Sequence, residues 1–148
     1  MFAMVNFAQV DTALTCFTEK DTWGFWRPIT AIPLADSDGN PATVAEPAWT
    51  PLLVTPPHPE YPSGHACATA AAMGTLAFFF GRDDIAFSAY SVDAGTTRRF
   101  RSFSQAVAEV IEARIWGGIH FRRADVQGAK IGAAVSDYVT RHYFRRLR

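Results

Sequence analysis

The segment YPSGHACATAAAMGTLAFFFG, residues 61–81, is the longest uncharged stretch of the chain. Its length would suffice to span a membrane. It opens with Pro-Ser-Gly-His, it is rich in small Ala and Thr residues, and the chain holds no second run of this kind. We therefore favour a buried bundle helix over about residues 63–80, ended by Gly81, above a membrane-spanning helix.

Three more helices are expected, over about residues 3–19, 102–116 and 125–143, and Gly117-Gly118 ends the second of them. The residues expected to face the core recur at helical spacing: Phe7, Val10, Leu14 and Phe17 in the first helix, and Val126, Ile131, Val135, Tyr138 and Val139 in the last. No segment alternates convincingly between apolar and polar residues, as a half-buried strand would. The sequence thus predicts an all-α fold, a helical bundle of about four main helices.

A long Pro-rich loop is expected over residues 33–60, where seven prolines interrupt any regular element. Loops of this length inside a domain are usually functional or disordered. Trp49 and Tyr61 favour a packed, functional loop. We interpret residues 1–148 as a single domain.

Composition excludes several classes of protein. With 49% hydrophobic and 19% charged residues, the 148-residue chain is not a disordered one. Its 14 basic and 14 acidic residues cancel, so a globally basic nucleic-acid binder is not indicated. Two cysteines make neither a disulfide framework nor a zinc site. The first residues lack the basic region of a secretion signal, so we expect a soluble protein, cytoplasmic by default.

Three short clusters carry residues suited to chemistry: KDTWGFWRP at 20–28, PSGH at 62–65, and RIWGGIH at 114–120, which Asp125 follows. Together they indicate an oxyanion site. Lys20, Arg27 and Arg114 supply three positive charges. Ser63 and Gly64 lie where a helix begins, and free backbone N–H groups favour an anion there.

The histidines give this site its reactive groups. His120 can act as a nucleophile or as a ligand of a metal oxyanion, and His65 as a general acid or base. Asp125 could hold one ring nitrogen of His120 and fix its tautomer, although an N-cap of the last helix is an equally good interpretation. His58 lies in the Pro-rich approach to the site.

Each cationic or capping residue also has a purely structural interpretation. Lys20 and Arg27 could be solvated residues around an aromatic loop, and Ser63 could be no more than a helix N-cap. Arg114 could pair with Glu109 or Glu112 on its own helix, although their spacing is poor for that.

In this order, Lys-x6-Arg-Pro, Pro-Ser-Gly-His and Arg-x5-His resemble the three-part signature of the type 2 phosphatidic acid phosphatase and vanadium haloperoxidase superfamily. The stretches FWRPITAI, TPPHPEYPSGHA and RIWGGIHFRRAD look like its soluble haloperoxidase branch. Proteins of this branch are generally longer and have two helical bundles. The chain resembles their C-terminal half, so we expect a homo-oligomer or a need for the missing N-terminal helices.

The resemblance implies a role for each site residue. Five residues would hydrogen-bond the oxyanion: Lys20, Arg27, Ser63, Gly64 and Arg114. His120 would be the axial vanadate ligand, or the nucleophile that accepts the phosphoryl group in a phosphatase. His65 would be the acid–base, and His58 would tune the oxidation step.

Three functions remain as hypotheses. The first is a vanadate-dependent haloperoxidase that oxidises halide, with bromide favoured, at the expense of hydrogen peroxide. The second is an acid phosphatase that hydrolyses a phosphomonoester through a phosphohistidine at the same site, because a pocket shaped for phosphoryl transfer also binds vanadate. The third is an inactive bundle that only binds phosphate.

Overall fold

The computed structural model describes residues 1–92 and 94–144. Its elements, in chain order, are α1 (Phe2–Trp23), α2 (Pro28–Ala31), the 3-10 helix η1 (Ala35–Ser37), α3 (Gly64–Phe80), β1 (Phe87–Ser91), β2 (Thr96–Phe100), α4 (Phe103–Trp116) and α5 (Arg122–Tyr143). The predicted bundle of four main helices is confirmed, and its helix ends fall within about four residues of the expected ones.

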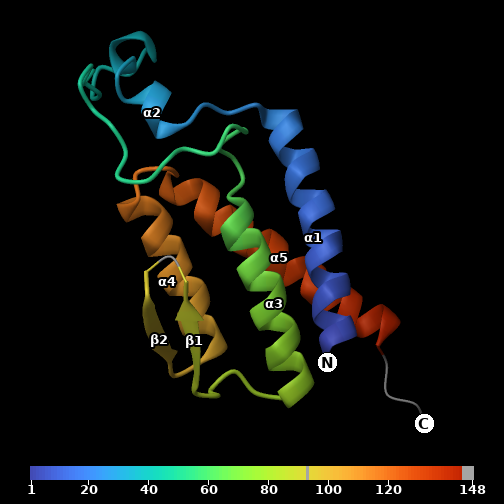
Figure 1. Cartoon of the computed structure of the whole chain (residues 1–148). Coiled ribbons are helices and arrows are strands. Elements are labelled where there is room, and N and C mark those ends of the chain that lie inside the picture. The colour runs from blue at the N-terminus through green and yellow to red at the C-terminus, as the bar shows by residue number, and fades with distance from the viewer. Residues whose placement is uncertain (93, 145–148) are drawn as a thin grey trace.

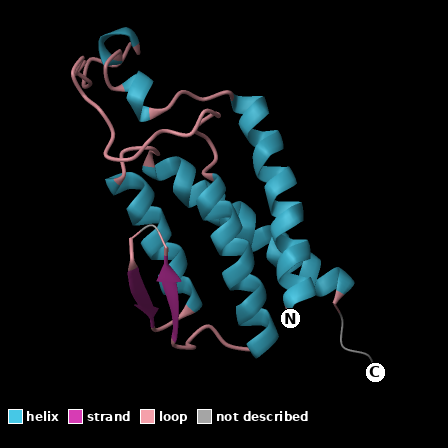
Figure 2. Ribbon diagram, viewed as in Figure 1, coloured by secondary structure: helices cyan, strands magenta, loops and turns pink. Residues whose placement is uncertain are grey.

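Helix α3 is the centre of the bundle and packs against α1, α4 and α5 (Figure 1). Helices α1 and α4 end where α3 and α5 begin, so four helix termini meet at one end of the molecule (Figure 1). The long loop between α2 and α3 lies over that end (Figure 2). Residues from the three sequence clusters therefore come together there.

Helices α3 and α5 approach each other through glycine. A Cβ atom at Gly128 would lie 2.5 Å from the Ser63 carbonyl oxygen, and one at Gly132 would lie 2.9 Å from the Ala70 Cβ and would collide with the Cys67 carbonyl oxygen. The close crossing thus requires glycine at both positions. It also fixes the start of α3, which contributes to the candidate site.

The small antiparallel hairpin of β1 and β2 was not expected from the sequence. Phe87 pairs with Phe100, their rings are 5.0 Å apart, and Phe87 also packs on Phe103 at the start of α4. The remaining strand residues are largely exposed. Because only the strand ends are covered, the alternation that identifies a half-buried strand is absent.

The prediction of the core-facing stripe of α1 was wrong. The large residues Phe7, Val10, Leu14 and Phe17 are exposed, whereas Met4, Ala8, Thr12, Cys16 and Lys20 are buried. In α5, Val139 is buried and Ile131 and Val135 are half-buried, but Val126 and Tyr138 are exposed. The helices approach through small residues, so the bulky stripe points away from the bundle.

The expected packing of the Pro-rich loop holds for part of it only, because residues 36–44, Leu52 and Val54 are exposed. The Leu53 N–H donates to the Gly117 carbonyl oxygen over 3.1 Å, and Trp49 lies beside Gly118, whose φ of 71° favours glycine. The loop therefore contacts the turn that leads from α4 to His120. No helix within residues 1–92 and 94–144 combines the length and the apolarity needed to cross a membrane.

Candidate active site

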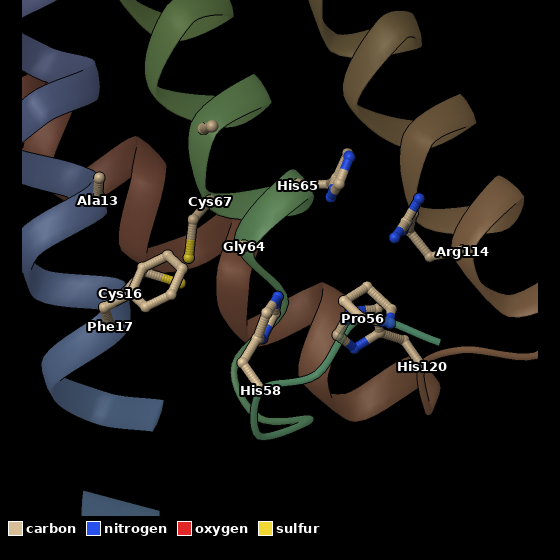
Figure 3. A pocket seen from close by; sticks show the side chains of 11 residues that line it. Ala13, Cys16, Phe17, Pro56, His58, Gly64, His65, Cys67, Arg114 and His120 are labelled. Carbon is tan, nitrogen blue, oxygen red and sulfur yellow. The ribbon is translucent and has the colours of Figure 1, made fainter. Parts of the chain in front are cut away.

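A cavity of about 300 Å³ opens where α1, α3, α4 and the long loop meet. Its lining includes His58, Gly64, His65, Arg114 and His120. Figure 3 shows His65 from α3 and Arg114 from α4 pointing toward a common space, with His58 and His120 at its other side. Residues distant in the sequence thus share one cavity.

The hydrogen bonds of His120 define its tautomer. Arg27 Nη1 lies 3.0 Å from His120 Nε2, and Glu60 Oε1 lies 2.9 Å from His120 Nδ1. Because a guanidinium can only donate, Nε2 accepts and carries no proton. Nδ1 therefore carries the proton and donates it to Glu60.

The surroundings of His120 keep its ring neutral. Its side chain is buried, and burial together with the charges of Arg27, Lys20 and Arg114 lowers the pKa of His120 to about 2. A neutral imidazole offers a lone pair at Nε2.

All three guanidinium nitrogens of Arg27 make hydrogen bonds within the protein. Its Nε donates to the His58 carbonyl oxygen over 3.0 Å and its Nη1 to the Ile119 carbonyl oxygen over 2.7 Å. Its Nη2 contacts His58 Nδ1 at 3.1 Å and the Pro59 carbonyl oxygen at 3.4 Å. An incoming oxyanion would have to replace some of these bonds, in particular the one to His120.

Lys20 is fully buried at the end of α1. Its Nζ donates to the carbonyl oxygens of Pro59 over 2.7 Å and of Glu60 over 3.1 Å. The third N–H of the ammonium group has no acceptor among the described residues. Burial, reinforced by the charge of Arg27, lowers the pKa of Lys20 to about 8. A solvated cation, the alternative interpretation of Lys20, does not agree with this burial.

Ser63 occupies the N-cap position of α3, but its hydroxyl makes no capping hydrogen bond. The buried Oγ atom has no hydrogen-bond partner among the described residues. A Cβ atom at Gly64 would lie 4.0 Å from Lys20 Cε, so the start of α3 adjoins the lysine. This helix start therefore places a hydroxyl without a regular partner and the positive end of a helix next to a cation.

Arg114 does not pair with either glutamate of its own helix. Glu109 is bound by Arg98 at 2.8 Å, and Glu112 by Arg122. The buried Arg114 Nε has no hydrogen-bond partner in the described part of the chain. The guanidinium is thus available to the cavity.

His65 and His58 line the cavity from different elements. Partial burial and the charge of Arg114 lower the pKa of His65, although its ring is still reached by solvent. Burial also lowers the pKa of His58, whose Nδ1 faces Arg27. Both rings are therefore largely neutral near pH 7.

Neither expected role of Asp125 agrees with the structure. Helix α5 begins three residues earlier than predicted and has Phe121 as its N-cap, so Asp125 lies in the first turn. Neither carboxylate oxygen has a regular hydrogen-bond partner among the described residues, His120 included. Burial raises the pKa of Asp125 to about 6, while the nearby Ser63 hydroxyl acts in the opposite direction.

Glu60 was missed by the sequence analysis and makes the contact that had been assigned to Asp125. Its Oε1 also accepts the Phe121 N–H over 2.9 Å, so one carboxylate holds both the ring and the backbone next to it. The available signal was its position three residues before Ser63, in the same loop as His58.

The unsatisfied polar atoms test whether an oxyanion fits here. Ser63 Oγ and Arg114 Nε are buried hydrogen-bond donors without a regular partner among the described residues. The Asp125 carboxylate, whose oxygens also lack one, lies near the Ser63 hydroxyl. Buried donors normally have acceptors. A tetrahedral oxyanion such as vanadate or phosphate would supply those acceptors, so the residues present fit it. No group of three or more His, Cys, Asp or Glu side chains in the described chain could hold a metal cation.

Residues 1–148 match the family described as "VCPO second helical-bundle domain", where VCPO stands for vanadium chloroperoxidase. The chain belongs to this family. The resemblance seen in the three sequence motifs is thereby confirmed. A search of the curated proteins gives no match.

Solved structures of vanadium enzymes share this VCPO helical-bundle fold. The first bacterial vanadium-dependent iodoperoxidase is 35% identical and superposes with a TM-score of 0.80 over 93% of this chain and 32% of its own. Bacterial vanadium-dependent chloroperoxidase is 19% identical in its holo form, with a TM-score of 0.75 over 94% of this chain and 35% of its own. Its apo form gives 20% identity and a TM-score of 0.72 over 94% and 36%. The chain therefore spans about a third of the length of these enzymes.

Proposed function

We propose that the chain forms the oxyanion-binding site of a vanadate-dependent haloperoxidase that oxidises halide, bromide in preference, with hydrogen peroxide. The observation that carries the proposal is the neutral His120, whose Nε2 lone pair lies beside Arg27 in a cavity that also holds Arg114 and the start of α3. A neutral imidazole is suited to bind vanadium directly, and among the three histidines of the cavity His120 is the one whose unprotonated Nε2 is fixed by a buried carboxylate on Nδ1. The family of the chain supports the same assignment.

The residues that would hold vanadate have hydrogen-bond donors that lack a partner or that can give up their present partner. Ser63 Oγ, Arg114 Nε and the remaining Lys20 donor would bind its oxygens. Arg27 would exchange its bond with His120 for one with the oxyanion. Bound vanadate supplies Lewis acidity toward hydrogen peroxide, which makes a peroxide oxygen transferable to halide.

His65 is suited to move the protons of this reaction. Its lowered pKa keeps the ring unprotonated near pH 7, so that it can accept a proton from hydrogen peroxide at the cavity. The helix that carries it places the ring across the cavity from His120 (Figure 3). A proton acceptor and a lone-pair donor are thus on separate histidines.

The proposal is tested with purified protein loaded with vanadate, assayed for peroxide-dependent oxidation of bromide and iodide and, without vanadate, for hydrolysis of a phosphomonoester. We expect the unmodified protein to oxidise halide and His120→Ala to lose this activity. His142→Ala is the matched control, because this exposed histidine lies near the far end of α5 and bonds the Tyr138 carbonyl oxygen. Hydrolysis without halide oxidation would favour a phosphohistidine phosphatase, and binding without either activity would leave an inactive phosphate-binding bundle.

A further inference from the structure

The two cysteines of the chain meet beside the candidate site. Cys16 lies on α1, one turn before Lys20, and Cys67 lies on α3, one turn after Ser63. Both are free thiols with 1% of their surface exposed. The Cys16 thiol donates to the Pro62 carbonyl oxygen over 3.9 Å. The Cys67 thiol lies next to it across the interface between the two helices, and Figure 3 shows the two sulfur atoms side by side.

Both cysteines also line the cavity that holds His65, Arg114 and His120. A small oxidant that reaches these residues therefore reaches the thiols as well. The cavity has room for several molecules the size of water, and hydrogen peroxide is only slightly larger. The thiols are closed to bulk solvent but open to the cavity.

We propose that Cys16 and Cys67 form a peroxide-sensitive pair that closes a disulfide between α1 and α3. Nothing in this step needs vanadate or halide, so it stands apart from the proposed function. The chain holds no other cysteine, so each thiol has the other as its intramolecular partner.

The surroundings assign the order of the two steps. The hydrogen bond from the Cys67 thiol lowers the pKa of Cys16, and the charge of Lys20 acts in the same direction. That hydrogen bond and burial raise the pKa of Cys67. Cys16 also lies one turn before the buried Lys20 on the same helix, so the nearer cation favours its thiolate. Since the thiolate is the nucleophile, we infer that Cys16 reacts first.

The chemistry balances with hydrogen peroxide as the oxidant. The Cys16 sulfur attacks one peroxide oxygen, the O–O bond breaks, and the departing hydroxide takes up the thiol proton as water, which leaves a sulfenic acid. The Cys67 sulfur then attacks the Cys16 sulfur, the S–O bond breaks, and a second water leaves with the Cys67 proton. Two thiols are oxidised by two electrons, and one peroxide is reduced to two waters.

The test treats the fully reduced protein with a small excess of hydrogen peroxide in the absence of vanadate and halide. We expect the loss of both alkylatable thiols, a mass decrease of about 2 Da that reflects the two lost hydrogens, and a band that remains monomeric on a non-reducing gel. Dithiothreitol should restore both thiols. If both thiols of the peroxide-treated protein can still be alkylated after unfolding, the proposal is overturned. A mass increase from added oxygen without a disulfide would overturn it as well.

Two serine variants test the assigned order with a sulfenic-acid trapping reagent such as dimedone. In Cys67→Ser, Cys16 has no partner and its sulfenic acid should be trapped in most of the protein. In Cys16→Ser, Cys67 should be trapped at least severalfold more slowly. Equal trapping in the two variants would show that Cys16 is not the preferred site of attack.

Discussion

The carboxylate of Glu60 accepts a 2.9 Å hydrogen bond from Nδ1 of His120, and both side chains are only 2% exposed. This bond holds the proton on Nδ1 and leaves Nε2 as the acceptor that faces Arg27. A ring that Glu60 did not orient could present either nitrogen to the cavity. Glu60 is thus a positioning residue for the group on which the proposed function depends.

We predict that Glu60→Ala destabilises the fold by roughly 2–5 kcal/mol, because two buried donors, His120 Nδ1–H and the Phe121 N–H, lose their acceptor. Glu60→Gln should cost less than half of this, since its amide oxygen can still accept. Urea unfolding measures the difference. Glu46→Ala is the control, because Glu46 is exposed in the same loop. Equal stability of the two alanine variants would contradict the role of Glu60.

Local motifs predicted the residues of the site but not all of their contacts. The three clusters predicted that Lys20, Arg27, Ser63, Arg114 and His120 would meet, and the structure brings them to one end of the bundle. The partner of His120 is 60 residues away in the sequence. Only the path of the loop decides whether Glu60 or the nearer Asp125 reaches the ring, and a motif does not encode that path.

The core was harder to predict than the helices themselves. Periodicity finds a helix correctly but assigns the bulky stripe to its buried face. Here α1 buries Ala8, Thr12 and Cys16 and exposes Leu14 and Phe17. A signal that favours the observed packing was present in Gly128 and Gly132, because a small residue every fourth position allows two helices to approach closely.

We predict that Gly132→Ala costs more stability than Gly128→Ala, and that Gly74→Ala costs least. A Cβ at Gly132 meets backbone atoms of α3 most closely, whereas one at Gly74 meets the Ser136 hydroxyl at 3.0 Å, and that side chain can rotate. Overpacking costs typically about 1–3 kcal/mol, against which alanine regains about 1 kcal/mol of helix propensity. Thermal and urea unfolding of the three variants give the order. A reversed order would mean that the helices do not cross as described.

The exposed stripe of α1 is expected to drive association of this chain. Phe7, Val10, Leu14 and Phe17 lie at helical spacing on one face of α1 and are between 49% and 66% exposed. An exposed apolar patch of this kind favours association. We predict that the chain forms oligomers at micromolar concentration and that Leu14→Glu shifts it toward the monomer. Light scattering measures both. A stable, well-folded monomer of the unmodified chain would contradict the prediction.

His58 is predicted to tune halide oxidation without holding the oxyanion. Its Nδ1 faces Arg27 Nη2 at 3.1 Å, so its removal loosens one side of the guanidinium. The loss of one such hydrogen bond corresponds to roughly a twofold to tenfold change in rate. His58→Ala should change bromide turnover and its pH profile by about this much and leave vanadate affinity nearly intact. If neither turnover nor the pH profile changes, His58 has no part in the site.

Lys20 gives the sharpest prediction about pH. Burial lowers its pKa to about 8, so the free protein loses this charge as the pH rises through that value. A charge-assisted hydrogen bond contributes about 1.5–3 kcal/mol, and the affinity for sulfate, whose own charge is constant here, should therefore fall about tenfold or more above pH 8. Calorimetry on wild type and Lys20→Met measures this, and the variant should bind weakly with a flatter pH profile.

The same lysine should affect stability with the opposite sign. Its ordinary pKa of 10.5 applies to the unfolded chain, so between about pH 8 and 10.5 the unfolded state holds more protons than the folded state. The contribution of Lys20 to the free energy of unfolding therefore rises with pH across this window. The same deprotonation removes the positive charge that binds sulfate, so the affinity for sulfate falls. We expect the stability of wild type to rise relative to Lys20→Met between about pH 8 and 10.5. Binding and stability that change in the same direction would show that Lys20 does not titrate inside the site.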